Sequence, residues 1–322
     1  MTVAVVVPCY RVSKQVLSVL SAIGPDCTRI YVVDDACPER TGDMVERCCS
    51  DPRLHVIRNE RNLGVGGATM VGMRAALDDG AEVIVKLDGD GQMPPALIPR
   101  LVQPIMEGRA DYTKGNRFFD LEGVRAMPRV RLIGNSVLSF ATKLSTGYWN
   151  VFDPTNGFTA IHAAVARQLP FQKISRDWFF ESDVLFRMST LRAVVADVPI
   201  PAIYGQERSN LVIRRVVWRF ICGHVANTAK RLFYNYYLRN FNIASIELPV
   251  GLAFLGFGFG FGAWKWVQGS LNNAAATSGT VMLAALPVLL GVQLLLAFLG
   301  YDLQNVPRDP LHPRLVPQKG GS

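Results

Sequence analysis

The stretch VIVKLDGDGQMPP, residues 83–95, places two carboxylates directly after a short β-branched run. Glycine alternates with Asp88 and Asp90, and because glycine favours positive φ and destabilises both helix and strand, the strand should end there. Ligands bind at the carboxyl ends of strands in open α/β sheets. Two neighbouring carboxylates repel, and a divalent cation with hard oxygen ligands relieves that repulsion. The stretch predicts a Mg²⁺ or Mn²⁺ site for a phosphate-bearing substrate, with a plain Asp-Gly surface turn as the alternative.

Three further β-branched runs precede this stretch and alternate with helical segments. Such alternation is typical of βαβ units and a mostly parallel α/β sheet. The expected strands are residues 3–7, stopped by Pro8, then 29–33, 54–58 and 83–87, and the expected helices are residues 13–22 and 68–77.

Polar or glycine-containing loops follow all four expected strands, at the same edge of the sheet. Four converging loops of this kind predict a nucleotide pocket. Asp35 can accept a hydrogen bond from a base imide or a ribose hydroxyl, and Pro8 with Tyr10 can pack against a base. Glycines after Asn62 allow the backbone to approach a ligand, with close helix packing as the alternative. The loop residues are Pro8 and Tyr10, Asp34 and Asp35, Asn62 and Gly64, and Asp88 and Asp90.

Composition divides the chain into a polar part and an apolar part. Of 322 residues 49% are hydrophobic, and the net charge is +8. The hydrophobic excess lies mostly beyond residue 247. The six cysteines contain no C-x-x-C pair, so they are interpreted as reduced cytosolic thiols rather than a disulfide framework or a zinc site.

The second part has the pattern of a membrane protein. Residues 212–246 interleave basic and aromatic side chains, which indicates amphipathic helices in the headgroup layer. This pattern also suits single-stranded nucleic acid, but the neighbouring apolar segments favour the membrane. Residues 247–302 contain two expected spans, at about 248–267 and 281–301. Because the outer flanks are basic, we expect a hairpin in the inner membrane, with residues 1–211 and the tail 303–322 in the cytoplasm.

The ordered motifs resemble those of family 2 glycosyltransferases with the GT-A fold, a Rossmann-like α/β sheet. The motifs are VVVPCYRV, VVDDACPERTGD, RNLGVGGA and KLDGDGQMPP. The later segments GNRF, DPTNGF and FFESD are similar to the polyisoprenyl-phosphate glycosyltransferases, the group that contains dolichyl-phosphate mannose synthase and bacterial undecaprenyl-phosphate glucosyltransferases. The resemblance covers residues 3–211 by motif.

This resemblance implies roles on the donor side. Asp35 would contact the donor base, and Asp88 and Asp90 would act in catalysis by holding the donor diphosphate through the metal, assisted by Gln92. Arg208 and Ser209 would contact the pyrophosphate, although Asn210 stands where the family often has lysine.

On the acceptor side the resemblance implies that Arg117 and Arg131 bind a phosphate, which suits the planar guanidinium fork. Arg125 and Arg129 lie in the same stretch and join them as candidates. Glu181 and Asp183 occupy the place of a general base in many related transferases, with capping or pairing at the start of a helix as the alternative. An ionised lipid phosphate needs no base, so Asp183 would then orient groups instead. Asp153 and Gly157 would shape the acceptor wall.

The expected function is inverting transfer of a hexose from a nucleotide diphosphate sugar to polyprenyl phosphate. A UDP-sugar is favoured over a GDP-sugar by analogy alone. The alternatives are a processive polysaccharide synthase and a non-catalytic membrane module that binds nucleotide sugars. The expected partners are the nucleotide sugar, polyprenyl phosphate and membrane lipids, without nucleic acid, and a homo-oligomer stays open.

Overall fold

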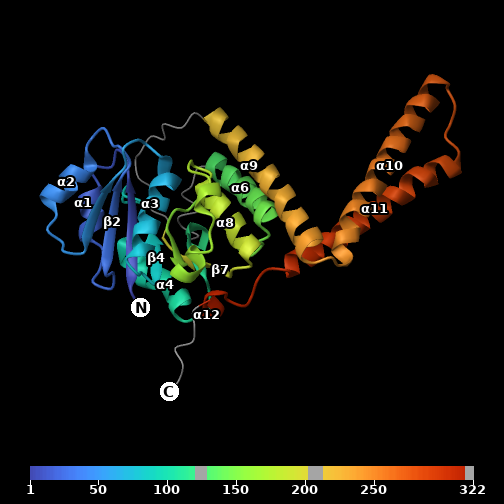
Figure 1. Ribbon diagram of the computed structural model, residues 1–322. Helices are drawn as coiled ribbons and strands as arrows, with labels where there is room; N and C mark the ends of the chain where they lie inside the picture. Colours follow the sequence, from blue (N-terminus) through green and yellow to red (C-terminus); the bar gives the residue numbers. More distant parts are fainter. Residues whose placement is uncertain (120–128, 202–212, 316–322) are drawn as a thin grey trace, which may run out of the picture. The chain divides into compact units, whose positions relative to one another are not determined.

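The computed structural model of the protein describes residues 1–119, 129–201 and 213–315, without the side chains of residues 129–131 and 213–215. The chain forms two compact units, one of Met1–Ala229 with Pro307–Ser322 and one of Lys230–Val306. Each unit is described by itself below, with the labels of Figure 1.

The first unit is built on a seven-stranded sheet in the described part of the chain, with the order β3-β2-β1-β4-β6-β5-β7. Strand β6 is antiparallel to both β4 and β5, and the other neighbouring strands are parallel. The prediction of a mostly parallel α/β sheet is confirmed. The strands are β1 (Val3–Cys9), β2 (Arg29–Asp34), β3 (Leu54–Arg58), β4 (Val83–Lys86), β5 (Tyr112–Asn116), β6 (Thr159–His162) and β7 (Val195–Pro199).

Helices cover both faces of this sheet. Helices α1 and α4 pack on the face that carries Val5 and Val85, where they close one apolar core. Helix α3 packs on the other face, at Val6 and Val33. The described helices and helical turns of this unit are α1 (Val16–Ser21), α2 (Thr41–Cys48), α3 (Gly64–Asp78), η1 (Pro95–Leu97), α4 (Ile98–Met106), η2 (Arg117–Phe119), α6 (Arg129–Thr146), α7 (Ala163–Ala166), η3 (Phe171–Lys173), α8 (Phe180–Leu191), most of α9 (Ile213–Phe233) and α12 (His312–Leu315).

Strand β1 does not stop at Pro8, contrary to the prediction, but continues to Cys9. The even-numbered residues of β1 direct their backbone groups toward β4, as the bond from Leu87 N to Val6 O shows. Pairing with β4 ends at Val6, while pairing with β2 continues to Cys9. The missing N–H of Pro8 therefore removes no ladder hydrogen bond.

Helix α3 begins at Gly64, earlier than the predicted residue 68, because the glycine-rich stretch forms its first turn. A Cβ added at Gly66 would lie within 3.0 Å of the Phe180 side chain and of the Ser175 carbonyl. The alternative of close helix packing is therefore what the structure shows for Gly66.

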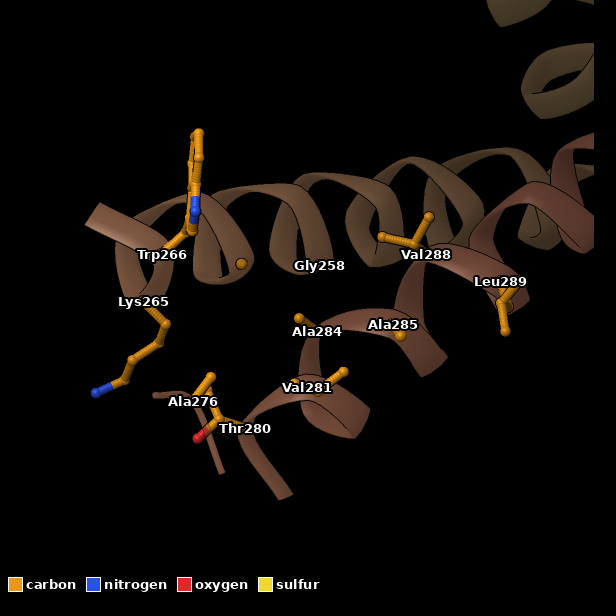
Figure 2. Close-up of a pocket in the computed structure, with 11 residues that line it drawn as sticks. Gly258, Lys265, Trp266, Ala276, Thr280, Val281, Ala284, Ala285, Val288 and Leu289 are labelled. Atoms are coloured by element: carbon orange, nitrogen blue, oxygen red, sulfur yellow. The ribbon is translucent and has the colours of Figure 1, made fainter. Parts of the chain in front are cut away.

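The second unit consists mainly of two long helices, preceded by the π-helical turn η4 (Tyr234–Arg239). Helices α10 (Ile243–Leu271, 29 residues) and α11 (Ser278–Gln304, 27 residues) are long and apolar enough to cross a membrane. They pack through Gly251, Gly258 and Gly291, where an added Cβ would meet the opposite helix. Near the connection between them lies an apolar pocket of about 490 Å³, between small residues such as Gly258 and Ala284 (Figure 2).

A buried ion pair ties the two ends of this second unit together. Arg231 donates to both carboxylate oxygens of Asp302, at 2.6 and 3.1 Å, and the Tyr236 hydroxyl donates to the same carboxylate at 2.5 Å. All three side chains are buried. The charges are paired and hydrogen-bonded, as buried charges must be.

Residues that follow the second unit return to the first. The fully buried carboxylate of Asp111 accepts hydrogen bonds from the backbone of Val194, Leu311 and His312, each at 2.8 Å. The His312 ring also contacts this carboxylate at 2.8 Å and stacks on His162. Residues before and after the two long helices therefore belong to one folded body.

We predict that Asp111→Ala strongly destabilises the first unit. The substitution leaves three backbone donors, two of them buried, and a buried imidazole without their acceptor, and each buried donor left unsatisfied costs about 1–3 kcal/mol. Thermal unfolding of the full chain in detergent measures this as a lower Tm. The control is Asp309→Ala, because Asp309 is exposed and pairs with the exposed Arg314 at 3.8 Å. Equal Tm values for the two variants would contradict the prediction.

Candidate active site

The loop after β4 carries the two predicted metal-binding carboxylates. Asp88 and Asp90 are both half-buried, and Gly91 between Asp90 and Gln92 adopts a positive φ of 78°. The backbone N–H of Gln92 donates to Asp90 Oδ1 at 3.0 Å, which folds the loop back on itself. The sequence therefore builds a tight acidic turn at the carboxyl end of a buried strand, as expected.

Lys86, the last residue of β4, lies beneath this loop and is 1% exposed. Its ammonium group lies 2.7 Å from Asp88 Oδ1 and 3.2 Å from Glu181 Oε1. Burial alone would lower the pKa of Lys86, but the charges of Asp88 and Glu181 outweigh burial, so the pKa lies above its ordinary value. The amine stays charged and holds Asp88 in place.

Gly157 lies against both Lys86 and Asp88. Lys86 Nζ also donates to the Gly157 carbonyl at 3.4 Å. A Cβ at Gly157 would lie within 3.0 Å of both Asp88 Oδ2 and Lys86 Nζ. Only glycine fits here without moving the carboxylate.

Asp35 sits at the end of β2 and is 2% exposed. Its carboxylate accepts hydrogen bonds from Asn59 Nδ2 at 2.7 Å and from the backbone of Leu63 and Gly64 at 2.8 and 2.9 Å. Asn62 also accepts a bond from the Gly64 N–H, at 3.0 Å. Asp35 thus orders the loop between β3 and α3, and the structure brings it together with the predicted loop residues Asn62 and Gly64.

The other two predicted base contacts differ from each other. Pro8 is buried within β1, whereas Tyr10, just past the end of that strand, is 43% exposed. Because β1 pairs with β2 up to Cys9 and Asp34, Tyr10 and Asp35 emerge at the same edge of the sheet.

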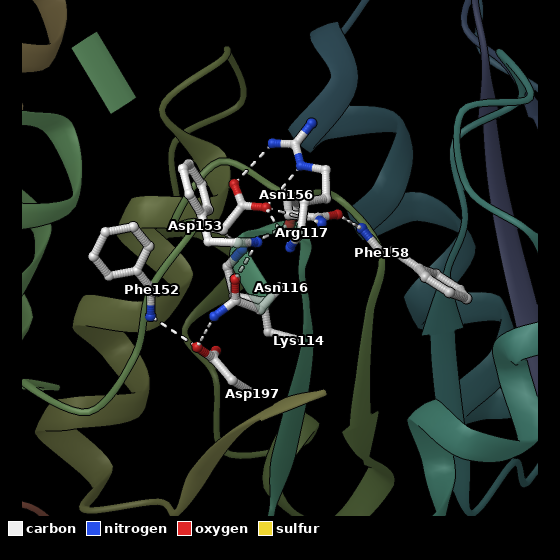
Figure 3. Close-up of polar contacts among 9 residues, drawn as sticks. Lys114, Asn116, Arg117, Phe152, Asp153, Asn156, Phe158 and Asp197 are labelled. Atoms are coloured by element: carbon white, nitrogen blue, oxygen red, sulfur yellow. Dashed lines mark hydrogen bonds and ion pairs between the residues drawn. The ribbon is translucent and has the colours of Figure 1, made fainter. Parts of the chain in front are cut away.

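A second polar cluster lies around Arg117 and consists of Lys114, Asn116, Arg117, Asp153, Asn156 and Asp197 (Figure 3). Arg117 binds the Asp153 carboxylate in a bidentate pair, with both distances 2.7 Å. Asp153 is 1% exposed and adopts a positive φ of 49°, an uncommon conformation for aspartate. Burial alone would raise the pKa of Asp153, but the bonds to Arg117 and the charge of Lys114 hold it below its usual value.

Lys114 supports the loop that contains Asp153 and Gly157. Its amine is fully buried and donates to the Asp153 carbonyl and, at 3.1 Å, to the Asn156 carbonyl. Burial lowers the pKa of Lys114 to about 8, against the charges of Asp153 and Asp197. One loop, residues 153–157, therefore contacts Arg117 at one end and the Asp88–Lys86 pair at the other.

Asp183 is held by hydrogen bonds in the first turn of α8. Its carboxylate accepts hydrogen bonds from the backbone of Ser175 at 2.9 Å and from Asn227 Nδ2 at 3.1 Å. Glu181, two residues earlier in the first turn of α8, instead reaches Lys86. Both carboxylates are thus paired near a helix start, which was the alternative considered for them.

Several predicted residues lie outside the described part of the chain. Arg125, Arg208 and Ser209 are in the ranges that are not described, and Arg129 and Arg131 are described only as backbone in the first turn of α6.

Sequence reasoning missed Lys86 and Lys114. Both lysines lie in predicted or observed buried strands, and lysine is almost never buried without a partner. A lysine in such a strand therefore indicates a buried acidic or carbonyl partner.

Comparisons with known proteins agree on one family. The sequence pattern described as "Glycosyl transferase family 2" matches residues 4–169. UDP-N-acetylglucosamine–dolichyl-phosphate N-acetylglucosaminyltransferase of Methanococcus voltae is 27% identical over 62% of this chain and 85% of that protein. Undecaprenyl-phosphate mannosyltransferase of Micrococcus luteus is 32% identical over 53% of this chain and 70% of that protein.

Solved structures share the fold. Glucosyl-3-phosphoglycerate synthase of Mycobacterium tuberculosis in complex with UDP superposes with a TM-score of 0.55, at 18% identity, over 71% of this chain and 80% of that chain. Its complex with Mn²⁺, UDP and glucosyl-3-phosphoglycerate gives a TM-score of 0.53, at 17% identity, over 71% of this chain and 79% of that chain. At this identity the likeness concerns the fold alone.

Proposed function

The chain belongs to glycosyl transferase family 2, and from this premise we propose that it transfers a hexose, with inversion, from a nucleotide diphosphate sugar to polyprenyl phosphate. The observation that carries the proposal is the loop of residues 153–157. Its Gly157 carbonyl accepts a hydrogen bond from Lys86, which also pairs with Asp88, and its Asp153 carboxylate pairs with Arg117. The loop would therefore join the proposed donor side to the proposed acceptor side. The names of the relatives from M. voltae and M. luteus describe transfer of N-acetylglucosamine with dolichyl phosphate and of mannose with undecaprenyl phosphate.

The donor site proposed here keeps the predicted residues. Tyr10 with Pro8 would pack against the base, and Asp35, which also orders the loop of Asn62 and Gly64, would contact the base. Gln92 would assist at the diphosphate. Arg208 and Ser209 are proposed to complete the clamp on the pyrophosphate. A UDP-sugar is the preferred donor, by analogy with the UDP-sugar in the name of the M. voltae enzyme.

Mg²⁺ or Mn²⁺ is proposed as the cofactor, with Asp88 and Asp90 as its ligands. Among the described residues, no group of three His, Cys, Asp or Glu is arranged to hold a metal ion. Two carboxylates at the edge of the sheet nevertheless fit a divalent ion whose remaining ligands are diphosphate oxygens and water, the usual arrangement for Mg²⁺. When bound, the ion would offset the charge that develops on the leaving diphosphate.

The acceptor phosphate is proposed to bind the arginine stretch, with Arg117 and Arg131 as its main contacts and Arg125 and Arg129 beside them. A phosphate monoester is already ionised at neutral pH, so its oxygen can attack the anomeric carbon without a base. The bond from that carbon to the diphosphate breaks as the new bond to phosphate forms. The structural partners of Asp183 agree with an orienting role rather than proton transfer.

The chain's own residues would prepare the site before substrate arrives. Lys86 holds the Asp88 carboxylate, and Lys114 holds the loop of residues 153–157. Neither the carboxylate nor the loop would need to reorganise during the reaction. Arg117 is already aligned by Asp153, and a phosphate would share this guanidinium with that carboxylate.

The two long helices support a membrane location. Their lengths and composition suit membrane spans. Because the residues on both sides of them belong to the first unit, a chain that crosses the membrane through these helices must return to the side from which it started. We propose a hairpin in the inner membrane, with residues 1–211 and the tail 303–322 in the cytoplasm and residues 212–246 at the interface.

Product analysis tests the proposed function. The full chain in detergent is incubated with undecaprenyl phosphate, Mn²⁺ and either UDP-hexoses or GDP-mannose, and the lipid products are examined by mass spectrometry. We expect one hexose per lipid phosphate, with release of the nucleoside diphosphate. A polymer would point to a processive synthase, and nucleotide-sugar binding without product would point to a non-catalytic module; either would overturn the proposal.

A further inference from the structure

Residues 175–183, SRDWFFESD, lead into helix α8 and form its first turn. We call this stretch the α8 entry segment. Four of its side chains, those of Phe179, Phe180, Glu181 and Asp183, are buried. Close-packed interiors transmit displacements to their neighbours, so the elements that contact this segment depend on where it lies.

On the donor side, the α8 entry segment contacts the first turn of α3. The Arg176 carbonyl accepts hydrogen bonds from the Gly66 and Gly67 N–H groups, at 3.0 and 3.3 Å. A Cβ added at Gly64 would lie within 3.0 Å of the same carbonyl. Because the Gly64 N–H also donates to Asp35, the segment helps to shape the loop that Asp35 orders.

The same segment contacts the acidic loop through a charge pair. Glu181 lies 3.2 Å from the Lys86 ammonium, which in turn lies 2.7 Å from Asp88. Glu181 and Lys86 are both buried, and the interaction between buried charges depends strongly on their separation. The α8 entry segment therefore contacts both the loop of Asp35 and the support of Asp88.

Helix α9 contacts the α8 entry segment with one face. Arg219, Gly223 and Asn227 are spaced by four residues, so they lie on the same side of the helix. At Gly223 the Phe179 ring packs against the helix backbone, since an added Cβ would lie within 3.0 Å of three ring carbons. The Arg219 guanidinium lies over the same ring, 5.4 Å from its centroid.

Asn227 provides the buried polar contact of this face. Its side chain is 4% exposed, and its Nδ2 donates to Asp183 Oδ1 at 3.1 Å. The other carboxylate oxygen of Asp183 accepts a hydrogen bond from the Ser175 N–H at 2.9 Å. Loss of the Asn227 amide would remove one hydrogen bond from a buried carboxylate, which is costly unless the carboxylate moves.

We propose that Asn227 is a positioning residue for the donor side of the site. Through Asp183 it holds the α8 entry segment where Glu181 pairs with Lys86 and where Arg176 binds the first turn of α3. Both contacts come from one short stretch of chain, so a shift of this stretch would loosen them together. This inference rests on the proposed function for the identity of the donor side.

The coupling would act in both directions. Whatever stabilises the Asp88 and Asp35 loops, such as a bound nucleoside diphosphate with its metal, should also stabilise the packing of α9 on the α8 entry segment. Helix α9 continues through η4 into α10, so the helix that precedes the first long apolar helix would help to form the donor site.

Hydrogen exchange followed by mass spectrometry tests this proposal on the full chain in detergent, without ligand. Asn227→Leu removes the amide at similar side-chain volume, and Val225→Ala is the matched control because Val225 is 65% exposed on the same helix. We expect Asn227→Leu to speed exchange about fivefold or more in peptides that cover residues 63–67 and 86–92, and the control to leave them unchanged. Protection of β1 shows that each variant is folded.

A purely structural role for Asn227 predicts a different result. Exchange would then rise only in α9 and the α8 entry segment, the Tm would fall, and residues 63–67 and 86–92 would keep their protection, which would overturn the proposal. If Asn227→Leu does not fold, Arg219→Ala replaces it, because Arg219 binds Asp177 of the same segment in an exposed pair at 2.8 Å. Unchanged exchange at residues 63–67 and 86–92 in that variant would overturn the proposal as well.

Nucleotide binding gives a second readout. The Kd of UDP with Mn²⁺, measured by calorimetry below the Tm, should rise about fivefold or more in Asn227→Leu and stay unchanged in Val225→Ala. An equal Kd in both variants would overturn the proposal. Absence of UDP and GDP binding by the unmodified chain would instead overturn the proposed function, and the two failures are distinguishable because the exchange comparison needs no ligand.

Discussion

Asp90→Ala should abolish most of the transfer activity while the chain stays folded. Asp90 is one of only two carboxylates proposed to hold the metal, and its loss would leave the charge on the leaving diphosphate poorly compensated. Removing several kcal/mol of transition-state stabilisation corresponds to a loss of about 10²- to 10³-fold in kcat. Transfer to undecaprenyl phosphate and Mn²⁺ binding in the presence of UDP should both fall, and chelation of the metal should reproduce the loss in the unmodified chain.

The matched control for this substitution is Asp26→Ala, which removes an exposed loop carboxylate in the same unit. Its activity and Tm should equal those of the unmodified chain. Full transfer by Asp90→Ala would show that the acidic loop is the plain surface turn that its sequence also allows.

Gly157→Ala should lower kcat/KM by a factor on the order of 10², because a misplacement of about 1 Å at a catalytic group costs that much. The added Cβ would lie within 3.0 Å of Asp88 Oδ2 and Lys86 Nζ, so the Asp88 carboxylate must move. Overpacking also costs about 1–3 kcal/mol of stability, and activity is therefore measured well below the Tm. Binding of UDP with Mn²⁺ should weaken as well, because Asp88, the carboxylate that must move, is a proposed ligand of the metal on the donor side.

Gly24→Ala is the comparison, because a Cβ there would meet only Asp26, at 3.9 Å. If Gly157→Ala lowered the Tm but kept normal turnover at low temperature, Gly157 would serve packing alone, and the proposed link between the loop of residues 153–157 and Asp88 would be wrong.

The general fold could be predicted from local patterns. Strand β3 was predicted with its observed bounds, and both long helices were found from uncharged apolar segments, since periodicity and composition report directly on burial. Element ends were less predictable. Strand β1 continues through Pro8 because its neighbour β4 stops pairing at Val6, and sheet register of this kind is not encoded in the strand itself.

The family, the acidic turn at residues 88–92 and the arginine-rich stretch could all be inferred from the sequence, because each is carried by short motifs of neighbouring residues. Which carboxylates pair with the buried Lys86 ammonium, by contrast, depends on the fold. Lys86 lies between Asp88 and Glu181, and Asp183 turns toward Ser175 and Asn227 instead. The physical reason is burial: a charged group removed from water must be paired, and the partner comes from whichever element the fold places against it.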